Sequence, residues 1–550
     1  MGRKFRRWRS LSSERPTSLK DVAGILLANR QFTQLSQLTY GDFGLTAVVE
    51  TMVKAISDGK RIGLYADYDV DGTMSCVSWI WFLEAIGYNN FVHYIPCRFK
   101  EGYGLNLKAI QHLIDDERAE LIITMDTGIT ANLEAAYCRE RGVEFICTDH
   151  HVIQPEKMPD CIILNPKMHP DSMYKELCGC GITFVLLRKL GERVGAPASI
   201  WTDLLALTGM ATICDVVPLN GVNHRLAKLG VAALSQSRRP VIRELMSACQ
   251  TLKDVDEKDV GFRLGPRINA VGRLEHADSV IKAFIGADPK PLIEHMDTCN
   301  EQRKKIQRSI VEQARREAAR YGDAPVLFLG GDWHPGVVGI AASKIAEEFW
   351  RPVWLYQRQA DVCKGSARSV RGFDVTAAMS QVGSMFTKFG GHAAAGGFTF
   401  ATAKEDYIRA ALTDVAAAMR AEKPEIWESQ IVFDCELPSD LATLSLTEEL
   451  DGLKPFGHGF EEPRFAIKAE ITGTRFYNCK ETGEPRHTCV MIRAGATARP
   501  QKVMFFNEVH EDLKDVTEAT FVVSAGRSTF GGETSLTLYG HDFALEATAI

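Results

Sequence analysis

A run of acidic residues constrains the fold of this chain more than any other feature. The segment Asp67-Tyr68-Asp69-Val70-Asp71-Gly72 holds three carboxylates within five residues, and these repel one another strongly at neutral pH. The apolar run Arg61–Tyr65 precedes the segment and predicts a strand, while the apolar run Thr73–Leu83 follows it and predicts a buried helix. The acids therefore lie in a turn inside a packed domain, where a bound cation is the leading explanation.

Short apolar strands alternate with helical segments between about Asp21 and Arg188. This alternation predicts a parallel sheet with crossover helices. The expected strands are Ile62–Tyr65, Phe91–Tyr94, Leu121–Met125, Glu144–Thr148 and Cys161–Leu164, and the expected helices include Leu107–Asp115 and Ala131–Arg141.

Acidic residues follow the ends of these strands. Asp67 follows the first strand, Asp126 follows the strand that ends at Met125, and Asp149 opens the triplet Asp149-His150-His151. Open parallel sheets collect their ligands at the carboxyl ends of their strands, so these side chains are expected to share one edge. A further acid, Asp215, stands alone in the apolar, helix-like run Ala206–Leu219, where it needs a metal or an arginine as partner.

These side chains predict a metal centre. Carboxylates with one or two histidines suit Mn²⁺ or Mg²⁺, and Zn²⁺ is also compatible. The set offers more ligands than one ion needs, so we expect two ions bridged by a shared carboxylate, an arrangement that hydrolyses phosphate esters. A calcium loop is a poor match, because its twelfth position requires Glu and holds Ser78 here. For any single acid a structural cap remains the alternative. The set is Asp67, Asp69, Asp71, Asp126, His150, His151 and Asp215.

Three later segments predict contacts with phosphate. Each combines glycine with basic or hydroxyl side chains, and glycine lets backbone N–H groups approach an anion closely. An ATP-binding P-loop is not expected, because Gly397 stands where that loop needs Lys. The segments are Phe262–Arg273, with Arg267, Asn269 and Arg273; Cys363–Ser369, with Ser366 and Arg368; and the glycine-rich loop Phe389–Phe398, with Gly391 and His392.

A chain of 550 residues is too long for one core. Pro291–Tyr321 predicts a long charged helix, whose basic residues form either a solvated face or one wall of a nucleic-acid groove. The remainder after Glu425 is rich in β-branched and aromatic residues and predicts a small β-barrel. The expected parts are a basic N-terminal tail at 1–20, a catalytic domain at 21–285, a connector helix at 286–322, a substrate-binding α/β domain at 323–422 and a barrel at 423–550.

The composition narrows the class of protein. No apolar stretch approaches the roughly 20 residues that span a bilayer, and the basic N-terminus lacks the apolar segment of a secretory signal. Fourteen scattered cysteines predict reduced thiols, as in the cytoplasm, and no zinc or disulfide framework. The formal net charge of −6 neither predicts nor excludes a nucleic-acid partner.

The motifs closely resemble those of the DHH phosphoesterase superfamily and, within it, the RecJ-type single-stranded-DNA exonucleases. The acidic segment, Met125–Gly128, Asp149–His151 and the Asp215 segment match the family's four catalytic motifs in order, and the resemblance runs from about Leu64 to Phe506. The segments that look like RecJ and not its shorter relatives are Pro96–Leu105, Gly265–Leu274, Gly336–Gly339 and Gly390–Gly397. The fold implied is an α/β chain with a parallel-sheet DHH domain, a smaller DHHA1 domain joined to it by a long helix, and a C-terminal OB-like barrel.

The resemblance implies a 5′→3′ exonuclease that releases 5′-mononucleotides from single-stranded DNA in recombination and repair. Its metal ligands would be Asp69, Asp71, Asp126, His150 and Asp215, with Asp67 and His151 beside them and Asp149 orienting the histidine pair. Arg98, Ser366 and Arg368 would hold the terminal 5′-phosphate near the backbone of Gly391 and His392. Phe456, Phe460 and Tyr477 of the barrel could stack on bases, although a buried core is the commoner fate of aromatic residues.

Two other functions remain open. One is a phosphodiesterase for short oligonucleotides or cyclic dinucleotides, whose members are shorter and lack the barrel. The other is a non-catalytic DNA-binding scaffold, which is expected to lose acids that this chain retains. The chain is expected to act as a monomer. It stops soon after the barrel, where many bacterial relatives carry a further domain, so a contact with single-strand-binding protein is a weak expectation.

Overall fold

The computed structural model describes residues 5, 7–34, 42–102, 104–251, 254–479, 482–493 and 500–545. Tyr103 of the Pro96–Leu105 segment, and residues 1–4 and 6 of the expected tail, lie outside the described residues. The chain divides into two compact units. We call Phe32–Arg303 with Pro455–Glu461 the acidic unit, and Met1–Gln31, Lys304–Lys454 and Glu462–Ile550 the barrel unit.

A parallel sheet forms the centre of the acidic unit. All residues of β2 and β4 are buried, as expected of parallel strands that are covered on both faces. The expected strands are confirmed, except that the first ends one residue later and the last begins one residue later than predicted. In sheet order the strands are β3 (Phe91–Tyr94), β2 (Ile62–Ala66), β4 (Leu121–Met125), β5 (Glu144–Thr148) and β6 (Ile162–Leu164).

Helices surround this sheet. The helix that follows the acidic segment, α3, is buried from Val70 to Leu83, which explains its lack of a polar face. The helices of this unit are α2 (Leu45–Ser57), α3 (Val70–Ala85), α4 (Leu107–Gln111), α5 (Asn132–Glu140), α6 (Gly179–Val194), α7 (Ile200–Cys214), α8 (Gly221–Gln236), α9 (Pro240–Ala248), α10 (Glu257–Asp259), α11 (Gly265–Leu274), α12 (Asp278–Ile285), the π-helical turns His112–Asp116 and Val260–Leu264, the 3₁₀ turns Pro155–Lys157 and Pro166–Met168, and the first part of α13 (Lys290–Ala318).

The helix bounds of two segments in this unit were not predicted from the sequence. The apolar run expected at Ala206–Leu219 is α7, which begins at Ile200 and ends at Cys214. The helix stops there because Val216 adopts a positive φ of 60° and Pro218 follows, so Asp215 lies at the helix end. The segment expected to contact phosphate, Phe262–Arg273, is helical and lies in the π-helical turn Val260–Leu264 and helix α11, with Pro266 in the first turn of α11.

The barrel unit contains a second α/β domain, built on its own five-stranded sheet. Its sheet runs in the order β10-β11-β9-β8-β7, and only β7 and β8 pair in parallel. Its elements are β7 (Leu327–Gly331), α14 (Val338–Phe349), β8 (Val353–Gln357), β9 (Val362–Arg368), α15 (Val375–Gln381), β10 (Lys388–His392), β11 (Ala395–Ala401) and α16 (Glu405–Glu422), with 3₁₀ turns at Ala319–Tyr321, Gly383–Met385, Thr402–Lys404 and Pro424–Trp427. Arg315, on the second part of α13, forms an ion pair with Glu348 of α14 at 2.6 Å.

The glycine-rich segment expected as an anion-binding loop is a β-hairpin. Strands β10 and β11 pair in antiparallel register, with Gly391 opposite Gly396, and only Ala393 and Ala394 connect them. Gly391 adopts a φ of 143°, and a Cβ there would collide with the backbone of the facing strand. The glycines therefore allow two strands to approach each other closely.

A closed β-barrel follows. Strand β14 pairs with both β15 and β17, so the sheet closes on itself and leaves few edges. The turn Gly531-Gly532 joins the two long strands β17 and β18. The elements are β13 (Cys435–Glu436), α17 (Leu444–Leu453), β14 (Phe465–Asn478), β15 (Pro485–Arg493), β16 (Gln501–Phe505), β17 (Glu518–Phe530) and β18 (Glu533–Ala544), with 3₁₀ turns at Ser439–Leu441 and Glu511–Leu513. Strand β12 (Gln430–Phe433) precedes them and belongs to a separate two-stranded sheet.

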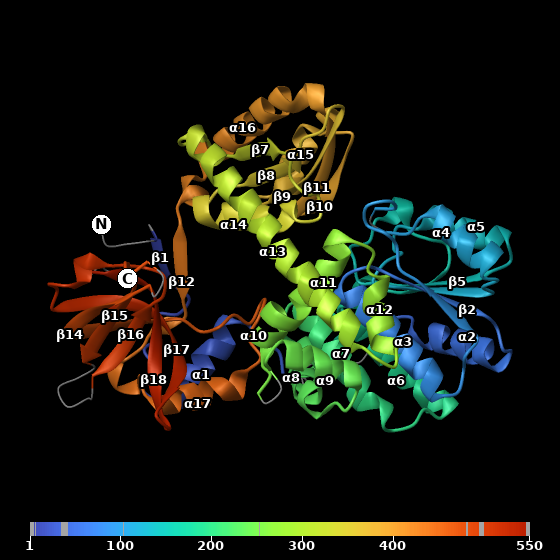
Figure 1. Ribbon diagram of the computed structural model, residues 1–550, viewed down its shortest axis with the longest axis horizontal. Coiled ribbons are helices and arrows are strands. Elements are labelled where there is room, and N and C mark those ends of the chain that lie inside the picture. Colours follow the sequence, from blue (N-terminus) through green and yellow to red (C-terminus); the bar gives the residue numbers. More distant parts are fainter. Residues whose placement is uncertain are drawn as a thin grey trace. The chain divides into compact units, whose positions relative to one another are not determined.

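The N-terminal residues, expected as a basic tail, belong to this barrel unit. Strand β1 (Arg7–Ser10) pairs in parallel with β12, and Figure 1 shows the dark-blue strand beside the orange one. Helix α1 (Leu19–Asn29), expected in the catalytic domain, also lies here. The Arg30 guanidinium binds both carboxylate oxygens of Asp434, at 2.6 and 3.1 Å, with both side chains about 95% buried. This ion pair attaches the end of helix α1 to the segment that precedes the barrel strands.

A short segment of the expected barrel belongs instead to the acidic unit. Phe456 and Phe460 are buried and stack on each other, and Phe460 also packs on Phe32 and His224. These two aromatic side chains therefore form core and are not available to stack on bases. Tyr477 on β14 is 47% exposed and remains available.

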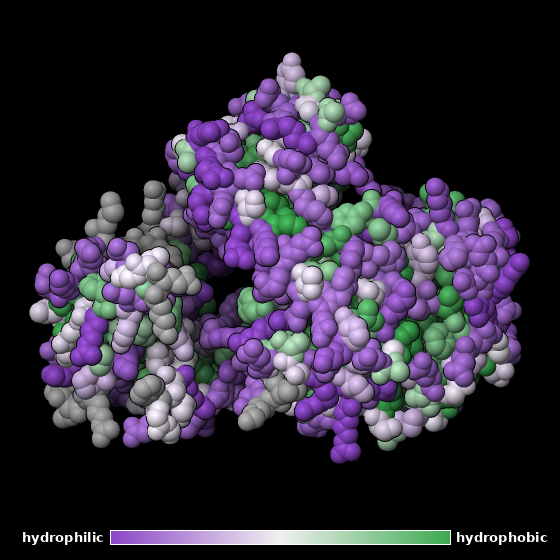
Figure 2. Space-filling view, in the orientation of Figure 1, coloured by the Kyte–Doolittle hydropathy of each residue, from purple (hydrophilic) through white to green (hydrophobic). Residues whose placement is uncertain are grey.

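The described part of the chain contains no helix that is long and apolar enough to cross a membrane. The face shown in Figure 2 is mostly hydrophilic, with small scattered hydrophobic patches.

The buried Arg30–Asp434 pair predicts a large loss of stability on truncation. Arg30→Ala leaves a buried carboxylate without its counter-charge, which costs about 3–5 kcal/mol. We expect the midpoint of urea unfolding of the barrel unit to fall accordingly. The matched control is Arg15→Ala, which breaks the exposed pair with Glu436 and should cost about 0–1 kcal/mol. Equal effects of the two substitutions would contradict this account.

Candidate metal centre

The carboxyl edge of the parallel sheet gathers the predicted side chains. Asp67 follows β2, Asp126 follows β4 and Asp149 follows β5. Asp69 caps α3, accepting hydrogen bonds from the backbone N–H groups of Asp71 and Gly72 at 2.9 and 3.1 Å. Asp126 adopts a positive φ of 60°, a conformation that costs free energy in a non-glycine residue and is found mostly at functional sites.

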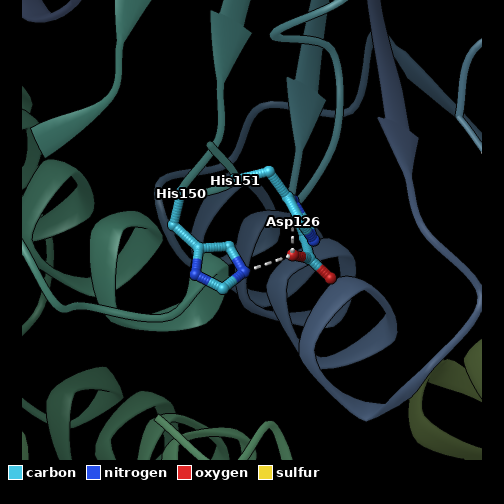
Figure 3. Close-up of side chains that lie close together, drawn as sticks. All are labelled: Asp126, His150 and His151. Carbon is cyan, nitrogen blue, oxygen red and sulfur yellow. Dashed lines mark ion pairs between the residues drawn. The ribbon is translucent and has the colours of Figure 1, made fainter. Parts of the chain in front are cut away.

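The His150 ring lies at the centre of this cluster. Its Nε2 is 3.1 Å from Oδ1 of Asp126, 3.6 Å from Oδ2 of Asp215 and 3.7 Å from Oδ2 of Asp71. Figure 3 shows both histidines beside the Asp126 carboxylate, and Nδ1 of His151 lies 4.0 Å from the same Oδ1. One point in the structure is thus surrounded by ligand atoms from β4, the β5 end, α3 and α7.

Asp149 holds the two histidines in place and does not face the other acids. Its Oδ1 accepts hydrogen bonds from the backbone N–H groups of His150 and His151, at 2.7 and 3.1 Å, and lies 2.7 Å from Nδ1 of His151. Its Oδ2 accepts from the N–H of Ile129 at 2.9 Å. Burial opposes ionisation of Asp149, but these hydrogen bonds and the charge of His151 outweigh it and lower the pKa.

The start of helix α6 holds Asp71. The backbone N–H groups of Gly179 and Cys180 donate to its two carboxylate oxygens at 2.6 and 2.7 Å, so the positive end of the helix faces the acid. No residue other than glycine fits at position 179 without moving its neighbours. A Cβ at this position would lie 2.6 Å from Cβ of Asp126 and 3.1 Å from Oδ2 of Asp71.

The electrostatics of the cluster favour a divalent cation. Burial, together with the neighbouring carboxylates, raises the pKa of Asp71 to about 6 and the pKa values of Asp67, Asp126 and Asp215 well above their ordinary range. One buried oxygen of each of these last three residues accepts no hydrogen bond from the described part of the chain. Buried polar atoms of native proteins nearly always have partners, so these oxygens fit a cation.

Three ligand sets share residues within the cluster. Asp126, His150 and His151 form one, Asp71, His150 and Asp215 a second, and Asp67, Asp69 and Asp126 a third, each with ligand atoms within 4.8 Å of one another. Asp126 and His150 each belong to two sets. Oxygen-rich sets with an imidazole suit Mn²⁺ or Mg²⁺. Asp67 and His151, which were expected beside the ligands, each belong to one of these sets.

The predicted phosphate-binding residues of the acidic unit separate into two groups. The Arg98 guanidinium lies over the ring of Tyr68 at 5.3 Å and favours the charged form of Asp67, and the charge of Arg273 also acts on Tyr68. These two arginines therefore lie near the acidic segment. Arg267 instead forms an ion pair with Asp297 on α13, and Oδ1 of Asn269 accepts a hydrogen bond from the N–H of Val70 at 3.1 Å. Arg267 thus links α11 to α13, and Asn269 holds the first residue of α3.

Residues of the barrel unit form a second predicted group. Ser366 and Arg368 lie on β9, which pairs with β11, and Nη1 of Arg368 donates to Oγ of Ser366 at 2.6 Å. Gly391 and His392 lie on the neighbouring β10. Gly339 on α14 leaves room for this pair, since a Cβ there would lie 3.1 Å from both side chains.

Two side chains that support the histidine pair were not predicted from the sequence. Asn165 is fully buried and its Nδ2 donates to the His151 carbonyl at 3.1 Å, and Nζ of Lys167 donates to the His150 carbonyl. The charge of Lys167 also favours the ionised form of Asp215. Both residues follow β6 at the same sheet edge as the acids, so the rule that located Asp126 would have located them.

Comparisons with known proteins identify the family. Family models match residues 61–212 as the DHH family N-terminal domain, residues 323–420 as the DHHA1 domain and residues 433–542 as the RecJ OB domain. The single-stranded-DNA-specific exonuclease RecJ of Dickeya dadantii is 31% identical over 528 residues, which cover 89% of each chain. The chain belongs to the RecJ family. The predicted fold, with its DHH, DHHA1 and OB-like domains, is confirmed.

Other members of the RecJ family extend the comparison. The Bacillus subtilis RecJ is 34% identical over 78% of this chain, and the match spans 54% of that protein, about half its length. The crystal structure of Thermus thermophilus RecJ in complex with Mn²⁺ superimposes with a TM-score of 0.83 at 26% identity, covering 98% of this chain and 80% of that one. A structure of exonuclease RecJ bound to manganese has a TM-score of 0.60 at 31% identity, covering 69% of this chain and 95% of that one.

The close approach at Gly179 predicts a specific loss of metal binding. Gly179→Ala would displace Asp126 and Asp71 from each other, because the new Cβ occupies the space between them. We expect Mn²⁺ affinity, measured by calorimetry, to fall about 10–100-fold, as for other residues that orient ligands. The matched control is Gly261→Ala in the same unit, whose Cβ meets only Ile213 at 3.7 Å. Unchanged affinity in Gly179→Ala would refute the packing argument.

The raised pKa of Asp71 predicts an unusual pH dependence of stability. The folded state holds its proton to about pH 6, whereas the unfolded value is 3.8, so the metal-free protein should lose stability as pH rises between these values. A shift of this size corresponds to about 3 kcal/mol. Thermal unfolding in chelator should therefore show a lower Tm at about pH 7 than at about pH 5. Added Mn²⁺ should raise the Tm more at the higher pH, because it binds the ionised acids.

The conservative variant Asp126→Asn provides the control for this pH dependence. It removes one repelling charge, so it should raise the Tm of the chelated protein at neutral pH and abolish most of the Mn²⁺ effect. A chelated wild-type protein that becomes more stable across this pH interval would contradict the assignment.

Proposed function

We propose that this chain is a metal-dependent exonuclease that degrades single-stranded DNA from its 5′ end and releases 5′-mononucleotides. The observation that carries the proposal is the arrangement around His150. Three acids from separate elements meet its Nε2 within 3.7 Å, and three buried carboxylate oxygens in the cluster accept no hydrogen bond from described residues. The name of the relatives, single-stranded-DNA-specific exonuclease, supports the substrate class.

The ligand sets suggest two Mn²⁺ or Mg²⁺ ions. Asp126 belongs to the set with His150 and His151 and to the set with Asp67 and Asp69, so it would help to hold metal in both sets. Such ions supply Lewis acidity that favours attack of water on the phosphodiester and stabilises charge on the leaving oxygen. The proposed ligands are Asp69, Asp71, Asp126, His150 and Asp215, with Asp67 in contact with metal or scissile phosphate.

The surrounding residues would position the acids and the substrate. Asp149 fixes the His151 ring through the hydrogen bond at Nδ1, so that its other nitrogen faces outward from that bond. The α6 N–H groups keep Asp71 oriented. Arg98, which carries a positive charge next to the acidic segment, would bind a phosphate, and in the barrel unit Ser366 and Arg368 would bind the terminal 5′-phosphate beside Gly391 and His392.

We further propose that the protein acts as a monomer in the cytoplasm. None of the fourteen cysteines forms a disulfide, which suits a reducing compartment. A contact with single-strand-binding protein stays a weak expectation. Light scattering on the purified protein, with and without single-stranded DNA, tests the oligomeric state.

A strand-degradation assay tests the function. Purified protein with Mn²⁺ should shorten a long single strand labelled at its 3′ end, releasing mononucleotides from the 5′ side, and chelator should stop the reaction. A blunt duplex of the same sequence should resist cleavage. Cleavage restricted to dinucleotides or cyclic dinucleotides would favour the oligonucleotide phosphodiesterase and reject the proposal.

A variant pair separates catalysis from binding. Asp126→Ala removes the shared carboxylate and should lower the cleavage rate more than about a hundredfold, while single-stranded DNA still binds. The matched control is Asp58→Ala, an exposed acid of the same unit, which should cleave normally. Unimpaired cleavage in Asp126→Ala would reject this centre as the catalytic site. Absence of cleavage in the wild type, with DNA binding intact, would instead indicate a scaffold.

A further inference from the structure

A second cluster of metal-ligating side chains lies in the acidic unit. Glu275 stands at the C-terminal end of α11, and His295 and Cys299 lie one turn apart on α13. One ligand atom from each of these residues lies within 4.8 Å of the others. No member of this group belongs to the ligand sets of the acidic segment.

The distances in this group suit a tetrahedral ion. Sγ of Cys299 lies 3.6 Å from Nε2 of His295. An ion with Zn–S of about 2.3 Å and Zn–N of about 2.0–2.1 Å places two tetrahedral ligands about 3.6 Å apart, so these two atoms already have the required separation. Oε1 of Glu275 contacts the same Nε2, and a small outward movement would make it the third ligand.

The exposure of the group also suits a metal. Cys299 is 96% buried, while the side chains of His295 and Glu275 are each about 60% buried, so the thiol forms the inner wall and the outer side is open to solvent. A water molecule can therefore complete four-coordination, as it does where a protein supplies three ligands.

We propose that Glu275, His295 and Cys299 form a second metal site that binds Zn²⁺. Thiolate and imidazole ligands select zinc over Mn²⁺ and Mg²⁺, which prefer the oxygen-rich centre around Asp126. The two sites of this unit would thus take different metals because their donor atoms differ. Binding would release the proton of the Cys299 thiol, since the thiolate is the zinc ligand.

The zinc site would join two helices that support the acidic segment. On helix α11, Asn269 accepts a hydrogen bond from the N–H of Val70. Gly272 of the same helix packs against the Tyr68 carbonyl. The Arg267–Asp297 ion pair already links α11 to α13. A metal bridging Glu275 to α13 would close the other end of α11 and so stabilise the turn that presents Asp67, Asp69 and Asp71.

A redox switch explains this cluster less well. Burial, together with the Glu275 carboxylate, raises the pKa of Cys299 to about 11, whereas oxidation-sensing thiols have lowered pKa values and exposed sulfur.

Cobalt spectroscopy on the intact protein tests the proposal. Co²⁺ added to chelator-treated protein should give a thiolate-to-metal charge-transfer band in the near ultraviolet. The band should persist in Asp126→Ala, because the acidic centre offers no thiolate among its ligand sets. It should disappear in Cys299→Ser and persist in Cys161→Ser, a half-buried cysteine that belongs to none of the ligand groups. No band in the wild type, or a band that survives in Cys299→Ser, would overturn the proposal.

A thermal measurement provides a second readout that needs neither nuclease activity nor the buried cysteine. In the Asp126→Ala background, Zn²⁺ should raise the Tm by a few degrees, because it binds only the folded state. His295→Asn, at a partly exposed position, should fold and should weaken Zn²⁺ binding about tenfold or more. Equal Tm shifts with and without His295→Asn would show that the three side chains form only a hydrogen-bonded group. Because these readouts are spectroscopic and thermal, they are independent of whether the protein cleaves DNA.

Discussion

The carboxylates at the carboxyl edge of the sheet repel one another, and much of the acidic unit serves to hold them together against that repulsion. Asp71 accepts hydrogen bonds from two backbone N–H groups of α6, and Asp69 caps α3. Asp149 forms hydrogen bonds with the histidine pair. Asp126 has no comparable donor among the described residues for its buried Oδ1. The scaffold thus satisfies the acids that orient the site and leaves ligand atoms of Asp67, Asp126 and Asp215 for a cation.

The acidic unit keeps its oxygen ligands and its thiol ligand in separate groups. Carboxylate oxygens surround the His150 ring. Among the described residues, the only ligand group that contains a thiol lies on other elements and consists of Glu275, His295 and Cys299. Helix α11 connects the two regions, because it holds the acidic segment through Asn269 and ends at Glu275. A change at one region can therefore reach the other through a single rigid helix.

Much of this arrangement was predictable from local pattern. The strands β3, β4 and β5 have their expected bounds, because buried parallel strands are short apolar runs with clear ends. The positions of Asp67, Asp126 and Asp149 follow from those ends. By contrast, the role of Gly179 depends on the tertiary approach of α6 to Asp126, and no residue pattern around it signals that approach. The contacts of Arg267 with Asp297 and of Asn269 with Val70 could not be predicted, because a basic, glycine-containing helix has the same composition as a phosphate-binding turn.

The pairing of β1 with β12 has a consequence for synthesis on the ribosome. Arg7 pairs with Gln430, so a strand made at the beginning waits for a partner made near the end. At about 5–20 residues per second, that delay lasts tens of seconds. Residues Phe32–Arg303, which make up nearly all of the acidic unit, emerge during the delay. The order of translation therefore favours completion of the acidic unit first, with the unpaired first strand exposed as an open edge until the barrel is made.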